Sequence, residues 1–174
     1  MTGRDFLNAV ANGQTDILAI LLKLLQETST DYCVVGGLAV NAYVEPVVSL
    51  DLDIVVIARS VEPLCHAAET AGLKLTRFEH SLNLTAPGSD LRVQIQTDAR
   101  YQAFIPRAET RTVLGYRMRV AALGDVLQGK LWAWSDPARR KSKRQKDLAD
   151  IARLVEAHPS LQESLPEEVR GRLD

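Results

Sequence analysis

The chain has 174 residues, of which 46% are hydrophobic and 25% are charged, and its formal net charge is −1. These proportions are typical of a globular protein that is long enough to bury one sizeable core. The small net charge excludes a protein whose whole surface binds a polyanion, so contact with nucleic acid would need a local basic patch. No apolar run has membrane-spanning length and none follows a basic N-terminal segment, so we expect a cytoplasmic protein without membrane association.

Residues 16–27 carry apolar side chains at helical spacing, which predicts a packing helix with Thr15 as its N-cap. The cysteines, Cys33 and Cys65, lie in apolar segments without metal-ligand spacing, so we interpret both as small buried hydrophobic residues in a reducing compartment. The histidines stand alone in the sequence, and we expect them to be non-catalytic: His66, His80 and His158.

The next segment contains the main functional signal. A short apolar strand is expected over residues 32–35, then a turn at Gly36–Gly37 and a short helix over residues 38–43. Asn41 in that helix is either a nucleotide contact or an ordinary helix-face residue. A second apolar strand follows, and it carries Asp51 and Asp53.

A helix capped by Ser60 and ending near Ala71 comes next, and three extended segments follow it over residues 73–79, 81–85 and 91–97. The last of these alternates apolar and polar residues, which is typical of a half-buried antiparallel strand. The segments on either side of Gly115, residues 110–114 and 116–120, predict a hairpin.

From residue 121 onward the pattern becomes helical, with helices expected over 123–134 and 143–157 and a break between them at Asp136–Pro137. The predicted fold class is therefore α+β, a small mixed β-sheet with flanking helices followed by a C-terminal helical segment. We expect an α/β core over residues 1–120 and a helical segment over residues 121–174, which together form one compact unit.

Two carboxylates on a buried strand need a chemical explanation. Side chains two residues apart on a strand share a face, with Cα atoms roughly 6.5 to 7 Å apart, so Asp51 and Asp53 can converge on one cation. Burying both charges without a partner is costly. Mg²⁺ uses one or two protein carboxylates and takes its other ligands from water and substrate phosphates. The pair therefore predicts a magnesium site, and the alternative is an edge strand with solvated aspartates.

The glycine pair adds a second half to this site. Without side chains, Gly36 and Gly37 let the backbone turn tightly and let phosphate oxygens approach the amides that open the next helix. An apolar strand ending in Gly-Gly and followed by an Asp-Leu-Asp strand resembles the signature of the nucleotidyltransferase superfamily, the DNA polymerase beta-like fold. Within it, the chain is most similar to small bacterial proteins of the AbiEii toxin type.

The resemblance implies two further site residues, Lys130 on one helix and Asp147 on the next. A lysine that faces the carboxylate pair would stabilise phosphate charge, and Asp147 would orient Lys130 or assist the acceptor. Each residue also has a simpler interpretation, Lys130 as a surface lysine and Asp147 as a helix-face carboxylate paired with Lys143 or Arg144. The basic run over residues 139–146 is either a solvated helix start or a basic lip for triphosphate or RNA.

One part of the expected pattern is missing. Nucleotidyl transfer commonly uses a third carboxylate on the neighbouring strand, but that strand carries Gln94 and Gln96. An amide takes no proton at neutral pH and is a poor magnesium ligand beside a carboxylate. Either Asp98 or Asp147 supplies the carboxylate, or transfer proceeds with the nucleotide-binding metal alone, or the protein binds nucleotide without turnover.

The resemblance implies a Mg²⁺-dependent nucleotidyltransferase that moves an NMP group from an NTP to a hydroxyl on tRNA, protein or a small molecule. A cognate antitoxin is an expected partner. The alternative is a catalytically silent nucleotide-binding or protein-interaction module of a toxin–antitoxin or defence pair, and an RNA-binding domain that uses the basic run is a weaker third hypothesis.

Overall fold

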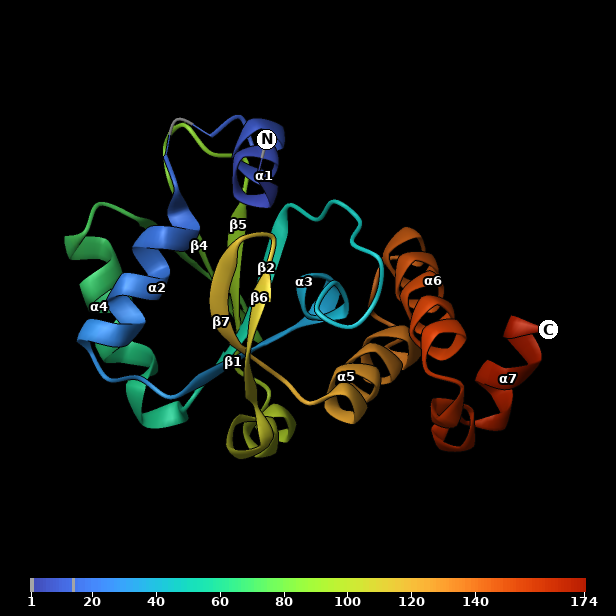
Figure 1. Ribbon diagram of the computed structural model, residues 1–174. Helices are drawn as coiled ribbons and strands as arrows, with labels where there is room; N and C mark the ends of the chain where they lie inside the picture. The colour runs from blue at the N-terminus through green and yellow to red at the C-terminus, as the bar shows by residue number, and fades with distance from the viewer. Residues whose placement is uncertain (1, 14) are drawn as a thin grey trace.

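The computed structural model describes residues 2–13 and 15–174 (Figure 1). A seven-stranded sheet runs through it in the order β3-β4-β5-β2-β1-β7-β6. Its strands are β1 (Tyr32–Val35), β2 (Asp51–Val56), β3 (Lys74–Arg77), β4 (Ser81–Thr85), β5 (Arg92–Gln96), β6 (Glu109–Val113) and β7 (Tyr116–Val120). The pairs β2–β5 and β1–β7 are parallel and the other pairs are antiparallel. The sheet is mixed, as the sequence predicts.

Helices lie on both sides of this sheet. The α-helices are α1 (Gly3–Val10), α2 (Ile17–Glu27), α3 (Gly36–Val40), α4 (Val61–Thr70), α5 (Leu123–Ser135), α6 (Lys141–Ala157) and α7 (Glu167–Leu173). Shorter 3₁₀ segments are η1 (Ala58–Ser60), η2 (Ala99–Arg107) and η3 (Pro159–Ser164). In Figure 1, α2 and α4 lie on one side of the sheet, and α3, α5 and α6 lie on the other. No helix among the described residues is both long and apolar enough to cross a membrane.

The alternation of side chains in the central strands decides which face is core and which is open. On β2, Leu52 and Ile54 are buried, and on β5, Val93 and Ile95 are buried. The residues between them point to the opposite face, because successive strand side chains alternate. The apolar face is covered by α2 and α4, so the acidic and amide residues of β2 and β5 face the C-terminal helices.

Most predicted elements are found within a few residues, but the N-cap of the first long helix was predicted wrongly. The side chain of Asp16 accepts a hydrogen bond from the Ala19 amide at 2.9 Å and caps α2. Thr15 instead donates its hydroxyl to the Pro87 carbonyl at 2.9 Å. Asp16 directly precedes the first helical residue, which is the position from which a side chain reaches the free amides of the first turn.

Two other predictions need correction. Strand β5 is antiparallel to β4 but parallel to β2, so it is a central strand with one partner of each kind. The short helix predicted over residues 38–43 begins at Gly36 and ends at Val40, so the glycine pair forms its first turn. The helices α1 and η2 were not predicted, and η2 contributes to the site described below.

Candidate functional site

The turn from β1 into α3 is built on one glycine that cannot be replaced without strain. Gly36 has φ +71°, and a Cβ added there would overlap Oδ2 of Asp53. The strand register explains this closeness, because Val35 pairs with Asp53. At Gly37 an added Cβ would lie 3.4 Å from Ser49 Oγ, which is an ordinary contact. Of the two glycines, Gly36 is therefore the one that the Asp53 carboxylate requires.

The two aspartates of β2 line one cleft of about 270 Å³, and they have different partners. Asp51 accepts hydrogen bonds at Oδ1 from Arg92 Nε at 3.0 Å and at Oδ2 from Lys143 Nζ at 3.3 Å. For Asp53, no hydrogen bond or ion pair with another described residue is found. Burial raises the pKa of Asp53 to about 6; the charge of Asp51 adds to this rise, and that of Lys130 opposes it.

Across the cleft, α5 and α6 hold a buried network of charged side chains. Lys130 Nζ lies 3.1 Å from Asp147 Oδ1 and 2.8 Å from Asp150 Oδ2. These three residues are 6%, 1% and 3% exposed. Arg139 Nε also pairs with Asp147, at 2.6 Å. Both simpler interpretations are therefore wrong: Lys130 is not a surface lysine, and the partners of Asp147 are Lys130 and Arg139.

Asp150 was not among the predicted site residues, although the sequence carries a signal for it. It lies three residues after Asp147 on α6, so both carboxylates face the same side of the helix. Asp150 also pairs with Arg153 Nη1 at 2.8 Å, and Arg153 Nη2 donates to the Glu45 carbonyl at 2.6 Å. The network thereby connects Lys130 to the loop that leads into β2.

Asn41 serves this loop as well. Its side-chain nitrogen donates to the Val47 carbonyl at 2.7 Å, and its side-chain oxygen accepts from the Val47 amide at 3.1 Å. Both halves of the amide are thus used to hold the backbone between α3 and β2. The structure gives Asn41 a role in shaping the loop.

The third carboxylate has no clear replacement in the described part of the chain. Gln94 pairs with Asp53 in the parallel register of β2 and β5, and Gln94 and Gln96 both line the cleft. Asp98 instead caps η2 and pairs with Arg100 at 2.7 Å. Asp147 lines the cleft, but its two oxygens are taken by Lys130 and Arg139. Within residues 2–13 and 15–174, no group of three His, Cys, Asp or Glu side chains has the placement of a metal site.

The cleft has a basic side and an uncharged side, which we define by their residues. The basic wall consists of Arg139 and Arg140, which directly precede α6, and of Lys143 in its first turn. These belong to the basic run of the sequence, which is therefore turned partly inward. The neutral wall consists of Gln94 and Gln96 of β5 and Tyr101 of η2.

Tyr101 was missed because η2 has no clear sequence signal. It is 7% exposed, and burial raises its pKa to about 12, so its hydroxyl keeps its proton at neutral pH. Trp132 of α5 packs against η2, with its ring stacked on that of Phe104 at 5.6 Å. Trp132 therefore has a structural role in the contact between α5 and η2.

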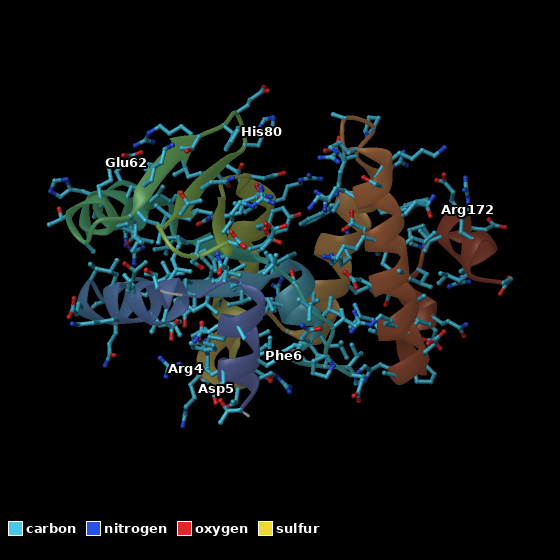
Figure 2. All side chains as sticks on the ribbon, turned by 90° about the horizontal axis from the view of Figure 1, so that it is seen from above. Arg4, Asp5, Phe6, Glu62, His80 and Arg172 are labelled. Atoms are coloured by element: carbon cyan, nitrogen blue, oxygen red, sulfur yellow. The ribbon has the colours of Figure 1, made fainter. Side chains whose placement is uncertain are left out.

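The cysteines and histidines lie away from this chemistry. Cys33 and Cys65 are free and buried, as expected, and burial raises the pKa of Cys33 to about 12. None of the three histidines lines the cleft. The side chain of His80 is 77% exposed and lies at the outer part of the sheet in Figure 2, on the side away from Arg172.

The residues present fit a magnesium ion with few protein ligands. Asp51 and Asp53 are hard oxygen donors on one face of one strand, and Asp53 is without a partner among the described side chains. Mg²⁺ is commonly bound by one or two carboxylates together with substrate phosphates and water. A nucleotide would supply the remaining oxygens, and the basic wall lies across the same cleft.

The chain is similar to known proteins in its fold and through one family model. No curated protein matches the chain. Among solved structures, the fold is similar to ANT(2")-Ia in complex with adenylyl-2"-tobramycin (TM-score 0.61, 15% identity, 91% of this chain and 97% of that chain). It is also similar to the lincomycin-bound lincosamide antibiotic adenylyltransferase LnuA (TM-score 0.55, 12% identity, 79% and 95%).

A third similar structure is an antigenic nucleotidyltransferase-like protein from Paracoccidioides brasiliensis (TM-score 0.52, 18% identity, 87% of this chain and 76% of that chain). At these identities the likeness establishes the nucleotidyltransferase fold. The family assignment comes from a family model described as "Nucleotidyl transferase AbiEii toxin, Type IV TA system", which matches residues 20–174. The chain therefore belongs to the AbiEii family of nucleotidyltransferases.

Proposed function

We propose that the protein is a Mg²⁺-dependent enzyme that moves an NMP group from an NTP to a hydroxyl acceptor. The observation that carries the proposal is the closeness of Gly36 to the unpartnered carboxylate of Asp53, inside a cleft whose opposite side is closed by Lys130. Membership of the AbiEii family supports it. We infer that residues 1–120 and 121–174 act as one unit, because Lys143 of α6 reaches Asp51 of β2.

Each residue of the cleft has a distinct task in this proposal. Asp51 and Asp53 would hold the magnesium ion, which when bound neutralises phosphate charge and orients the triphosphate. Gly36 and Gly37 let the triphosphate approach the backbone amides at the start of α3. Lys130 offsets the negative charge that develops during transfer.

Asp147 keeps Lys130 in place rather than serving the acceptor, because both of its oxygens already accept from cations. In the transfer itself, the acceptor oxygen forms a bond to the α-phosphorus. The bond between that phosphorus and the oxygen bridging to the β-phosphate breaks, and pyrophosphate leaves. The hydroxyl proton passes to water, since the cleft is open to solvent.

The test is replacement of one aspartate by its uncharged isostere. Asp51→Asn is expected to abolish labelling of an acceptor by NTP radiolabelled at the α-phosphate, while the circular dichroism spectrum stays native. Asp90→Asn, at an exposed position outside the cleft, is the matched control and should label normally. Labelling that persists in Asp51→Asn removes this residue from the mechanism.

The rival function is a nucleotide-binding module without turnover, and the position of Gln94 beside Asp53 is the observation that favours it. A thermal-shift series of NTPs with and without Mg²⁺ separates the two, because a ligand that binds only the folded state raises the apparent stability. Stabilisation that depends on the metal, without transfer to any acceptor, supports the rival. The family description, which names a toxin, motivates a cognate antitoxin as the proposed protein partner.

A further inference from the structure

Strand β6 leaves one edge of the sheet open. It is the last strand in the order of the sheet, and Figure 1 shows its hairpin with β7 at the front of the molecule. Outside that hairpin, no backbone hydrogen bond from residues 109–113 to another described residue is found. Such an edge is a template for pairing with another strand. The hydrogen-bonding pattern and the charges of β6 indicate which strand fits.

The turn between β6 and β7 fixes which backbone groups of β6 face outward. Leu114 and Gly115 have φ 50° and 84°, as in a type I′ turn, and the register makes them the two residues of the loop. The residues that flank such a loop are hydrogen-bonded to each other, and hydrogen-bonded and open pairs alternate along the hairpin. Thr110 and Thr112 are in open pairs, so their N–H and C=O groups point to the free edge.

The charges of β6 complement those of a second, antiparallel copy of the same strand. Glu109 and Arg111 are two residues apart and share one face of the strand. If Thr110 lies opposite Thr110 of the second copy, Glu109 of each chain lies opposite Arg111 of the other. Opposite charges and threonine pairs directly across strands both stabilise a sheet, whereas centring the pair on Arg111 would place two like charges opposite each other.

Arg111 has donor capacity for a second carboxylate. Its side chain is 38% exposed, and one of its terminal nitrogens lies 3.1 Å from Glu109 Oε2 of its own chain. The guanidinium carbon lies 4.3 Å from the centroid of the Tyr43 ring, which holds the side chain at the edge of the sheet. Its Nε has no hydrogen-bond partner among the described atoms. A guanidinium has five N–H donors, so a carboxylate from a neighbouring strand can also bind.

The opposite edge of the sheet lacks this complementarity. Strand β3 carries Lys74 and Arg77 and has no acidic residue, so an antiparallel copy centred on it would place each lysine opposite an arginine. Like charges that face each other destabilise strand pairing, and charged side chains protect an edge strand. Of the two edges, β6 is therefore the one that suits a second copy.

We propose that the protein forms a reversible homodimer in which β6 pairs antiparallel with β6 of a second copy, centred on Thr110. One sheet then continues through both chains. No residue of β6 lines the cleft of Asp51 and Asp53, so each cleft is complete within its own chain. Because β6 has five residues, the interface is small, and we expect association in the micromolar range.

Sedimentation velocity on the full chain tests the dimer. Between about 1 and about 300 µM, the wild type should change from monomer to dimer. Glu109→Arg and Arg111→Glu, each alone, place like charges opposite each other twice per dimer and should raise the dissociation constant at least about tenfold. An equimolar mixture of the two variants restores opposite charges at both places and should recover dimers. Lys74→Glu, on the other edge of the sheet, is the control and should leave association unchanged.

A disulfide crosslink tests the register. In the proposed dimer the two Cα atoms of residue 110 are about 5.5 Å apart, which is within the range of a disulfide. Thr110→Cys should therefore form covalent dimers under mild oxidation. Thr112→Cys is the matched control on the same edge, and it should stay monomeric on a non-reducing gel because its two copies lie about 13 Å apart. The chain's own cysteines, Cys33 and Cys65, are buried and should not react.

The inference is overturned by a wild type that stays monomeric over the whole concentration range, which would leave the β6 edge to an extended segment of another protein. It is also overturned by a dimer that neither charge variant weakens, by a mixture that recovers no dimers, or by crosslinks that form as readily at residue 112 as at residue 110. Recovery of dimers in the mixture shows in addition that both charge variants have kept their fold.

Discussion

The sheet side and the helical side of the cleft differ in how their charges are satisfied. On the helical side, Lys130, Asp147 and Asp150 are almost fully buried and form ion pairs with one another or with arginines. On the sheet side, Asp51 is paired with Arg92 and Lys143, but Asp53 has no partner among the described residues. Buried charges are normally paired, so the charges of the helical side are satisfied within the protein, and we propose that a ligand completes Asp53 on the sheet side. Mutations on the two sides should therefore fail in different ways.

The largest expected effect is on the sheet side, where loss of one carboxylate should remove activity without loss of stability. Asp53→Asn should lower the transfer rate about a thousandfold, since it removes a charge that would hold the metal. Its melting temperature without metal should be equal to or above that of the wild type. Asp98→Asn, which changes a carboxylate outside the cleft, should keep nearly full activity. If Asp53→Asn instead lowered the melting temperature and left the transfer rate normal, Asp53 would serve stability and not activity, contrary to the role assigned to the sheet side.

A substitution at Gly36 tests how closely the turn from β1 into α3 packs against the Asp53 carboxylate. Gly36→Ala should destabilise the fold by about 3 kcal/mol or more, because it combines a positive φ with a Cβ that overlaps Asp53. Gly37→Ala is the matched control and should cost much less, since its Cβ has room beside Ser49. Chemical denaturation measures both. Equal losses in the free energy of unfolding for Gly36→Ala and Gly37→Ala would contradict this account of the turn.

On the helical side, the expected loss is of stability. Asp150→Ala leaves Arg153 without its carboxylate and Lys130 with only Asp147, which should lower the free energy of unfolding by about 2 to 3 kcal/mol. Asp31→Ala removes an exposed ion pair with Arg59 of 3.7 Å and should cost less than about 0.5 kcal/mol. Urea denaturation compares the two variants. If Asp150→Ala lowered the free energy of unfolding as little as Asp31→Ala does, the buried charges would not hold α5 and α6 together.

The smallest effect is the pH dependence that burial of Asp53 imposes on the metal-free protein. Its pKa is raised to about 6 in the folded state, from an ordinary value of 3.8. Between these values the folded state binds the proton more tightly than the unfolded state, so this group should lower the free energy of unfolding as pH rises from about 4 to 6. The expected decrease is on the order of 1 to 2 kcal/mol.

The change should be seen as the difference between the wild type and Asp53→Asn in denaturation at several pH values. The asparagine variant has no carboxyl to titrate at this position, so the difference should level off above pH 6. A wild type and variant with parallel pH profiles would show that Asp53 is solvated in the folded protein.

The sequence by itself determined the strands, the glycine turn and the shared face of Asp51 and Asp53, because these depend on local spacing and on the alternation of side chains along a strand. It also indicated Lys130 and Asp147 through the family resemblance. The tertiary structure alone decided the partners of those charges: Asp150 and Arg139 around the lysine network, Lys143 and Arg92 on Asp51, and Tyr101 from η2. These contacts join residues far apart in the chain, and their geometry follows from how α5 and α6 pack against the open face of the sheet, which no local pattern specifies.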